Sequence, residues 1–462
     1  MTWLKITAAS SYLLVALATR LCGQSASLTP ELDSRIGALL TATGAPSVSV
    51  AVVQNGRISY VHAFGEADIA KDRRAEASTR YAVGSISKQF TAAALLLEQE
   101  QGKLSLDDKV SKYYPDLTRA NEVTIRELLS HTSGYEDYAP QDYLIPDWTR
   151  PITPEQILDR WAKKALNFDP GTEWQYSNTN YVLAGKILEK ASGEKLLPFL
   201  QEHFFQPLEM SSAGDCEIRN PADASAYTRY ALGPPRPVGR EATGWYFAAG
   251  ELCMTPSDLA RWDIAFLQKR ILSAKSYEEF TREVKLRDGK PTHYALGLDV
   301  GDFHGTPMIS HSGEVSGFLA ANRVYPAKNA ASVVLSNEDG LNLIGPVSDA
   351  IASVLVQPPN SAAEKQNEQV RRILAYLQEG RVDASLFTAN ANAYFNEVAL
   401  EDYRNSLSPL GKLQVLTRLG EQPRGGMTHL GYRAHFEKNT VLLNIYVMPD
   451  GKFEQFLVEG AL

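Results

Sequence analysis

The sequence predicts an α+β protein with two folded parts, a large domain over residues 27–356 and a small α+β module over residues 368–462. Strand-like runs lie at both ends of the large part, and a mostly helical, loop-rich segment (about 77–285) separates them. This order predicts one sheet assembled from distant parts of the chain. A length of 462 residues, with 44% hydrophobic and 22% charged residues, is typical of a globular protein of two domains.

The large part opens with a predicted helix and a hairpin. Thr29 and Pro30 are suited to start a helix that Gly44 ends. Asn55-Gly56 then joins two β-rich runs within residues 46–65, which is a strong hairpin signal. After the helical middle, strands are expected at 294–301, 306–313, 317–327 and 329–339, followed by a helix at 343–356.

A polar run at 357–367 contains Pro358-Pro359 and is predicted to be a linker. The module beyond it begins with a helix at 368–380, judged from its apolar spacing. Strands are expected at 411–421, 432–448 and 451–460, with a turn at Pro449-Asp450-Gly451. The role of this module is left open by the sequence.

Residues 1–26 are predicted to be an export signal that is cleaved. Lys5 precedes an apolar core at 6–18, and small residues follow around 23–26. The apolar core is shorter than the roughly 20 residues that span a bilayer as a helix, so no stable membrane span is expected. The protein is therefore expected in the periplasm or outside the cell. Arg20 and Leu21 stand where a lipid attachment signal at Cys22 would have small residues, which disfavours lipidation.

Cys216 and Cys253 are the cysteines that would remain after cleavage. An exported protein could pair them, but we expect two buried thiols in separate elements.

The net charge of −8, without a concentrated basic patch, excludes a nucleic-acid surface. The histidines show no metal-binding spacing such as His-Glu-x-x-His, so no metal and no cofactor are expected. Neither a Gly-rich phosphate loop nor a Gly-x-Ser-x-Gly elbow occurs, which disfavours a nucleotide enzyme and an α/β-hydrolase. The expected partner is a small-molecule or peptide substrate. The sequence gives no signal for the oligomeric state.

Ser85 and Lys88 stand three residues apart where a long apolar helix is predicted to begin. Backbone N–H groups at a helix N-terminus favour developing negative charge, whereas a lysine there opposes the helix dipole. A serine hydroxyl becomes a useful nucleophile when an adjacent base takes its proton. A lysine serves as that base only when burial or nearby cations lower its pKa.

Three short motifs occur in one order along the chain. The Ser-x-x-Lys pattern occurs at Ser85/Lys88 and Ser192/Lys195, Tyr-x-Asn at Tyr176/Asn178, Tyr394/Asn396 and Tyr403/Asn405, and the third triplet at His311-Ser312-Gly313. Requiring a helix-starting serine, then a loop tyrosine, then a strand-end triplet selects Ser85, Tyr176 and His311. The second Ser-x-x-Lys pattern is assigned to structure, because Gly193 ends the preceding helix.

With these motifs the sequence resembles the serine β-lactamase and penicillin-binding-protein superfamily. The resemblance is to its class C β-lactamase-like branch, which includes D,D-peptidases, D-aminopeptidases and esterases, and it covers residues 28–356. Supporting runs lie at 124–135, 168–193, 248–262 and 311–318. It implies a β-lactamase/transpeptidase-like domain, with an antiparallel sheet flanked by helices and a helical subdomain.

The resemblance also implies residue roles. Ser85 would attack a carbonyl to form an acyl-enzyme, and Lys88 and Tyr176 would share its proton. Asn178 would hold Lys88 and a substrate amide, and the backbone N–H groups of Ser85 and Glu314 would form the oxyanion hole.

The triplet His311-Ser312-Gly313 would line the substrate site, and many relatives have lysine at the first position. Neutral histidine there predicts a weaker or pH-dependent grip on a substrate carboxylate, which favours a peptidase or esterase over a potent β-lactamase. His131 is expected to fix a turn near the cleft. The aromatic segment 135–143 either lines the substrate rim or forms an ordinary exposed loop.

The leading hypothesis is an exported serine hydrolase that acts through a Ser85 acyl-enzyme on amide or ester bonds. Its substrate would be a D-amino-acid peptide, a muropeptide, a β-lactam or a small ester. The alternative is a non-catalytic ligand-binding or penicillin-sensor protein on the same fold.

Overall fold

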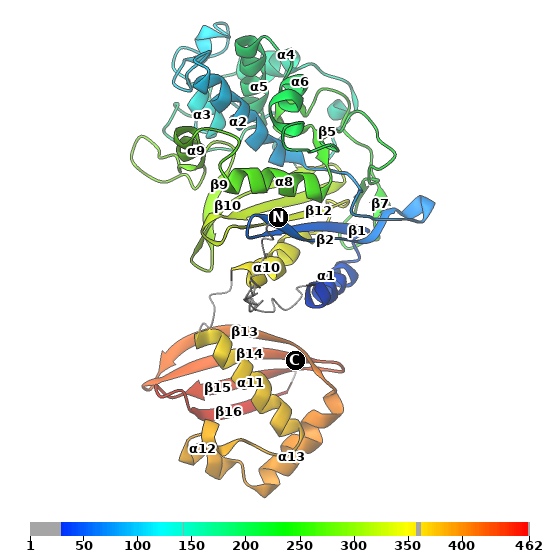
Figure 1. The fold of residues 1–462 in the computed structure, drawn as a ribbon, viewed down its shortest axis with the longest axis vertical. Helices are drawn as coiled ribbons and strands as arrows, with labels where there is room; N and C mark the ends of the chain where they lie inside the picture. The colour runs from blue at the N-terminus through cyan, green and yellow to red at the C-terminus, as the bar shows by residue number, and fades with distance from the viewer. Residues whose placement is uncertain (1–28, 142, 357–361, 461–462) are drawn as a thin grey trace, which may run out of the picture. The chain divides into compact units, whose positions relative to one another are not determined.

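The computed structural model describes residues 29–141, 143–356 and 362–460 (Figure 1). The predicted signal peptide, Cys22 and the first residues of the predicted linker lie outside these ranges. The chain divides into two compact units between Val356 and Gln357.

A seven-stranded antiparallel sheet organises the first unit, in the order β3-β2-β1-β12-β11-β10-β9. Its strands are β1 (Ser47–Gln54), β2 (Arg57–Asp68), β3 (Arg73–Arg74), β9 (Asp299–Phe303), β10 (Thr306–Val315), β11 (Phe318–Tyr325) and β12 (Ala330–Ser336). Pairing of β1 with β12 joins segments almost 300 residues apart, as the sequence predicted. Asn55 and Gly56 form the predicted hairpin turn with φ values of 53° and 69°.

Both faces of this sheet are covered, as Figure 1 shows with α8 (Pro256–Leu267) on one side and α1 (Thr29–Thr43) and α10 (Ile344–Leu355) on the other. Along β1, Val50 and Val52 pack with α1 and α10, whereas Ala51 and Val53 belong to the main core on the opposite face. Successive side chains of a strand point to opposite faces, so a strand covered on both faces is apolar throughout.

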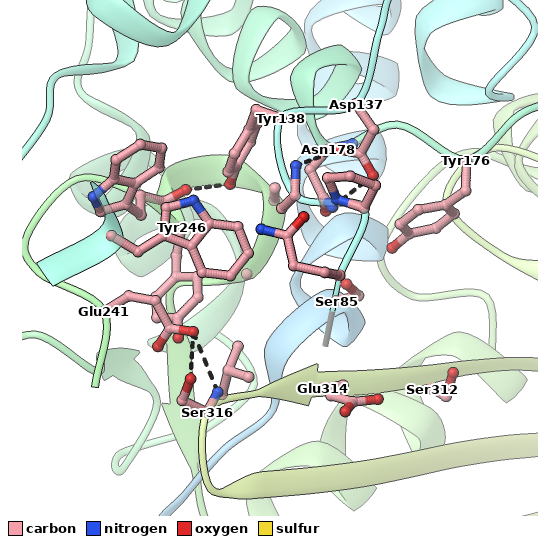
Figure 2. A pocket seen from close by; sticks show the side chains of 18 of the residues that line it. Ser85, Asp137, Tyr138, Tyr176, Asn178, Glu241, Tyr246, Ser312, Glu314 and Ser316 are labelled. Carbon is pink, nitrogen blue, oxygen red and sulfur yellow. Dashed lines mark hydrogen bonds between the residues drawn. The ribbon is translucent and has the colours of Figure 1, made fainter. Parts of the chain in front are cut away.

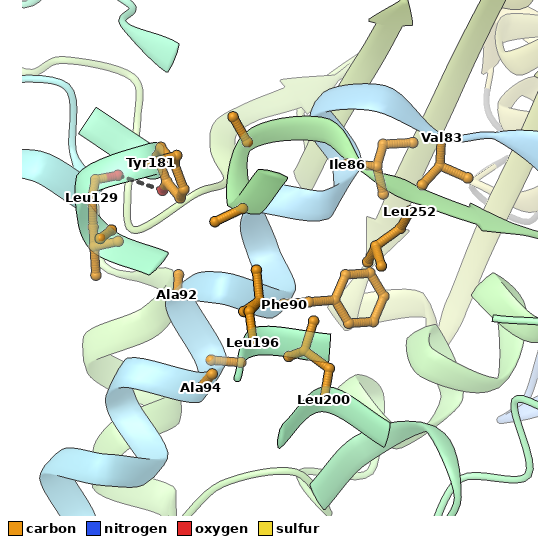
Figure 3. Packing of buried hydrophobic residues seen from close by; sticks show 14 of the residues in the cluster. Val83, Ile86, Phe90, Ala92, Ala94, Leu129, Tyr181, Leu196, Leu200 and Leu252 are labelled. Atoms are coloured by element: carbon orange, nitrogen blue, oxygen red, sulfur yellow. Dashed lines mark hydrogen bonds between the residues drawn. The ribbon is translucent and has the colours of Figure 1, made fainter. Parts of the chain in front are cut away.

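The helical subdomain surrounds α2 (Ser87–Glu100), whose apolar side packs in the main core. Figure 3 shows Ile86, Phe90 and Ala94 of this segment among buried residues such as Leu252. The other helices of the unit are α3 (Ile125–Leu129), α4 (Pro154–Ile157), α5 (Asn178–Ser192), α6 (Leu196–Leu200), α7 (Phe247–Gly250) and α9 (Ala274–Thr281). Gly193 ends α5 in a left-handed conformation, in agreement with the structural role predicted for Ser192/Lys195.

The expectation of two free buried thiols was wrong, because Cys216 and Cys253 form a disulfide. Cys253 lies in β8 (Leu252–Met254), which pairs with β4 (Tyr81–Ala82) and β5 (Gly214–Asp215) in a small sheet. Cys216 follows β5 directly, and its N–H donates to the carbonyl of Glu251 at 2.8 Å. The two cysteines therefore lie on neighbouring strands. A two-residue strand leaves no pattern in the sequence that would have revealed this.

One predicted strand starts later in the structure than the sequence indicated. The strand predicted at 294–301 begins only at Asp299, because Gly297 (φ 73°) forms a turn closed by a bond from the N–H of Ala295 to the carbonyl of Leu298. A further pair, β6 (Tyr227–Thr228) and β7 (Arg236–Pro237), forms a two-stranded sheet.

The second unit consists of helices and one antiparallel sheet in the order β13-β14-β15-β16. Its elements are α11 (Ala362–Gln378), α12 (Ala389–Tyr394), α13 (Glu397–Leu407), β13 (Leu413–Arg424), β14 (Met427–Phe436), β15 (Thr440–Val447) and β16 (Phe453–Glu459). Helix α11 begins inside the predicted linker. The run predicted as one strand at 432–448 is two, because the N–H of Phe436 bonds the carbonyl of Asn439 and closes a polar turn.

Candidate active site

Ser85 lies in a 3₁₀ turn, η2 (Gly84–Ile86), that leads directly into α2. Strand β8 fixes this segment from one side: the N–H of Val83 donates to the carbonyl of Leu252, and the N–H of Leu252 donates to Ser87 Oγ. Ser85 is partly exposed and lines a pocket, as Figure 2 shows. The turn before the helix thus presents the Ser85 hydroxyl to a ligand in this pocket.

Lys88 lies on the first turn of α2 and is fully buried. Its Nζ donates to Ser85 Oγ at 2.9 Å, to Asn178 Oδ1 at 2.8 Å and to the carbonyl of Ala249 at 2.8 Å. Burial lowers the pKa of Lys88 to about 7, against the opposing effect of the Asp137 charge. An appreciable fraction of this amine is therefore neutral near pH 7 and able to accept a proton from Ser85.

Tyr176 completes the group around the serine hydroxyl. Its phenol lies beside Ser85, and Lys88 Nζ lies 4.9 Å from the centre of its ring. Burial raises the pKa of Tyr176 above its ordinary value, and the neighbouring Ser85 opposes this only in part. The phenol is therefore protonated near neutral pH. The phenol of Tyr176, which is distant in sequence, therefore lies beside the alcohol of Ser85 and the amine of Lys88.

Asn178 starts α5 and is held by a residue that the sequence analysis missed. Its backbone N–H donates to Asp137 Oδ1 at 2.9 Å, and its Nδ2 approaches Asp137 Oδ2 at 3.3 Å. With the amide nitrogen turned toward Asp137, the amide oxygen faces Lys88. Asp137 belongs to the segment 135–143, where nothing in the local pattern separates it from other acidic loop residues.

His131 fixes the turn that precedes Tyr176, as expected of a structural residue. It is buried with a φ of 60°, and its Nδ1 accepts the N–H of Ser177 at 3.1 Å. The centroid of its ring lies 4.3 Å from the centroid of the Tyr176 ring. The tilted ring of His131, packed against Tyr176, limits where the phenol can point.

His311 is buried on β10, and its Nε2 lies 2.8 Å from the hydroxyl of Tyr294. Burial first, and the charge of Lys88 second, lower the pKa of His311 to about 3. The imidazole is therefore neutral at any physiological pH. A neutral imidazole at this position favours a weaker carboxylate grip over a pH-dependent one.

Strand β10 passes close to the turn that carries Ser85. A Cβ added at Gly313 would lie 1.9 Å from the carbonyl oxygen of Val83 and 3.2 Å from the backbone nitrogen of Ser85. A Cβ at Gly84 would lie 2.8 Å from the backbone nitrogen of Glu314. The backbone amides of Ser85 and Glu314 therefore lie on adjacent segments, as an oxyanion hole requires. Ser312 and Glu314 also line the pocket along this strand (Figure 2).

The pocket has a volume of about 530 Å³ and combines aromatic walls with acidic groups. Its aromatic lining includes Tyr138, Trp148, Trp245 and Tyr246, and its acidic lining is Asp137, Glu241, Asp299 and Glu314. Residues 137–141 of segment 135–143 line the pocket, which agrees with the interpretation of this segment as the rim of the substrate site rather than an ordinary exposed loop. Among the described lining residues there is no lysine or arginine.

The described ranges, 29–141, 143–356 and 362–460, contain neither a metal-binding cluster nor a membrane-spanning helix. Within them no group of three or more His, Cys, Asp or Glu residues is placed to hold a metal ion. No helix of those ranges has the length and apolar character needed to cross a bilayer.

The fold agrees with comparisons to known proteins. The family model described as Beta-lactamase matches residues 32–352, and the chain belongs to this family. Penicillin-binding protein 4* of Bacillus subtilis is 29% identical over 374 residues, which cover 75% of this chain and 82% of that protein. The D-aminopeptidase of Brucella canis is 27% identical over 323 residues, covering 67% of this chain and 60% of the relative.

Solved structures give the same result for the fold. A D-stereospecific amidohydrolase from Streptomyces sp. aligns with a TM-score of 0.62 and 26% identity, over 71% of this chain and 99% of the other. The octameric penicillin-binding protein homologue from Pyrococcus abyssi aligns with a TM-score of 0.63 and 21% identity, over 93% of this chain and 99% of that one. The family is thus one of β-lactamase-fold hydrolases whose relatives include aminopeptidases, amidases and penicillin-binding proteins.

Proposed function

We propose that this protein is an exported serine hydrolase that cleaves amide or ester bonds through an acyl-enzyme on Ser85. The observation that carries the proposal is the buried Lys88 amine, 2.9 Å from Ser85 Oγ and with its pKa lowered to about 7. A buried lysine without a chemical role is costly in free energy. A lysine of lowered pKa beside a serine hydroxyl is what nucleophilic catalysis needs.

In the proposed reaction, neutral Lys88 takes the proton of Ser85 as Oγ attacks the substrate carbonyl. The backbone N–H groups of Ser85 and Glu314 stabilise the oxyanion. Tyr176, whose phenol is protonated, gives its proton to the leaving amine or alcohol and recovers one from Lys88. Water then attacks the ester carbonyl, and its proton passes through Lys88 and Tyr176 to Ser85 Oγ as the ester C–O bond breaks. Ser85 and the acid product are thereby released.

Within this reaction we favour an amidase, peptidase or esterase over a β-lactamase. Neutral His311 gives no positive charge to a substrate carboxylate. Similarity to a protein named D-aminopeptidase and to one named D-stereospecific amidohydrolase also supports an amide substrate with a D-amino acid.

The test is mass spectrometry of the intact protein after incubation with a fluorophosphonate and with a penicillin. We expect an adduct that maps to Ser85, none in Ser85→Ala, and acylation slowed about 10²- to 10⁴-fold in Lys88→Ala. Ser192→Ala is the matched control, since it alters the second Ser-x-x-Lys pattern, and it should react as the native protein does. Absence of any adduct, together with tight ligand binding, would instead favour the sensor.

A substrate panel then decides the reaction class. It should contain one D-amino-acid amide, one muropeptide, one β-lactam and one small ester, each assayed for release of product. We expect the amide or the ester to be turned over faster than the β-lactam. Faster turnover of the β-lactam would contradict the role given to neutral His311.

Export is part of the proposal and is supported by the disulfide between Cys216 and Cys253, because disulfides persist mainly in oxidising compartments. N-terminal analysis of the protein from a periplasmic or culture fraction should give a chain that starts near residue 27. A cytoplasmic protein that retains residues 1–26 would contradict export.

A further inference from the structure

Glu241 is a pocket residue that the proposed reaction does not use. Its Oε1 accepts a bond from Ser316 Oγ at 2.7 Å, and the N–H of Ser316 approaches the same oxygen at 3.4 Å. Its Oε2 is buried and has no hydrogen-bond partner. The hydroxyl of Tyr246, which lines the same pocket, is likewise buried and unpartnered. Leaving such buried groups without partners is costly in free energy.

The guanidinium of the neighbouring Arg240 acts on Glu241 only through its charge and forms no ion pair with it among the described residues. The guanidinium of Arg240 donates instead to the carbonyls of Cys216 and Ala224 and lies 5.1 Å from the ring centre of Phe318. Burial raises the pKa of Glu241, and the nearby charge of Asp339 acts in the same direction. A ligand that brings a positive charge would therefore relieve both the desolvation and the repulsion.

The position of Glu241 indicates which part of a substrate it meets. The leaving group must lie near Tyr176, which supplies its proton. The acyl part then extends the opposite way, past Glu314 toward the end of β10, where Ser316 follows. In the view of Figure 2, Glu241, Ser316 and Tyr246 lie on the other side of Ser85 from Tyr176.

The remaining acids of the pocket are less suited to this role. Asp137 is bonded to the N–H and side-chain amide of Asn178. Asp299 pairs with Ser310, next to His311, whose ring lies 6.3 Å from that of Tyr176, so Asp299 belongs to the leaving-group side. The side chain of Glu314 is exposed. Glu241 thus combines a buried, unpartnered carboxylate oxygen with a place on the acyl side.

We propose that Glu241 binds a protonated amine carried by the acyl part of the substrate, with the Tyr246 hydroxyl as a second acceptor for the same ammonium. This inference rests on the function proposed above and makes it specific: the preferred substrates are aminoacyl amides or esters with a free amine. A substrate with a carboxylate in its acyl part would be repelled by the same group.

The test compares acyl donors that share one leaving group and differ in charge but hardly in shape. The p-nitroanilides of D-alanine, glycine and 4-aminobutyric acid are paired with those of isobutyric, propionic and pentanoic acid, in which a methyl replaces the amine. We expect at least one amine donor to exceed its methyl partner in kcat/KM by about 10- to 100-fold. In Glu241→Gln, whose amide oxygen can still accept from Ser316, this ratio should fall to near one.

Asp299→Asn is the matched control, because it removes one acidic charge from the leaving-group side of the same pocket. It should keep the preference for the amine donor. A preference that survives Glu241→Gln, or that no amine donor shows in the native protein, would overturn the inference.

The fluorophosphonate adduct on native Ser85 separates this failure from failure of the proposed function. An adduct without a preference for amine donors would support the Ser85 hydrolase and contradict the role proposed for Glu241. Absence of the adduct would contradict both the Ser85 hydrolase and the role of Glu241. Melting temperatures of the variants identify any loss of folding, and a destabilised Glu241→Gln would be replaced by Tyr246→Phe, for which a smaller fall in the same ratio is expected.

Discussion

The amine of Lys88 is enclosed by three oxygen acceptors, from Ser85, Asn178 and the carbonyl of Ala249. These bonds would suit an ammonium ion, whereas burial favours the neutral amine. Burial is the larger effect and lowers the pKa to about 7. Small changes near this residue should therefore alter the fraction of active base at neutral pH.

The first prediction concerns the pH dependence of acylation. Since the neutral amine is the base, modification of Ser85 by a fluorophosphonate should rise about tenfold per pH unit below the pKa of Lys88 and level off above about pH 7. Asp137 raises this pKa through its charge, so Asp137→Asn should move the midpoint to lower pH. A midpoint near 10, the ordinary range of a lysine, would contradict the assignment.

At the scale of elements, the site depends on how closely β10 approaches the turn before α2. Gly313 leaves no room for a side chain, because the carbonyl oxygen of Val83 occupies the place of a Cβ. Glycine is required here for close approach of two backbones rather than for an unusual φ.

We accordingly expect Gly313→Ala to push β10 away from Ser85 and to reduce acylation by about 10²- to 10³-fold, the usual effect of losing an oxyanion donor. Gly301→Ala, in neighbouring β9, is the control, since a Cβ there meets nothing within 4 Å. Rates of adduct formation and melting temperatures should be measured for both. Equal rates in the two variants would show that β10 does not position the oxyanion hole.

The disulfide is a second feature at this scale, because it joins β8 to the chain after β5. It closes a loop with a sequence separation of 37 residues. Replacing both Cys216 and Cys253 with serine should lower the free energy of unfolding by about 2–4 kcal/mol. Urea denaturation measures the change, and a reducing agent should destabilise the native protein but not the double variant.

At the scale of the whole molecule, each compact unit has its own hydrophobic core. The second core contains residues of the second unit alone, among them Leu374, Tyr432 and Ile445. The described residues that line the pocket belong to the first unit. A domain with its own core can in principle fold alone.

We therefore expect a protein that ends at Val356 to fold and to form the Ser85 adduct at a rate within about threefold of the full chain, since no residue of the site is removed. Circular dichroism and adduct kinetics check the two parts of this prediction. A folded but unreactive first unit would show that the second unit contributes to catalysis. An unfolded first unit would show that the second unit contributes to stability.

Much of this protein was predictable from the sequence by itself. The helix that begins next to Ser85 and carries Lys88, the hairpin at Asn55-Gly56 and the strands β10 to β12 follow from local apolar patterns and turn residues. The order of the three motifs also identified Tyr176 and His311. Such features depend on neighbouring residues, whose conformational preferences act over a few positions.

Tertiary structure decided everything that depends on residues distant in sequence. The pairing of Cys216 with Cys253, the hold of Asp137 on Asn178 and the unpartnered oxygen of Glu241 leave no local pattern. The lowered pKa values of Lys88 and His311 are likewise set by burial. The physical reason is the same in each case: desolvation and pairing are properties of the packed surroundings, which form only when separate segments come together.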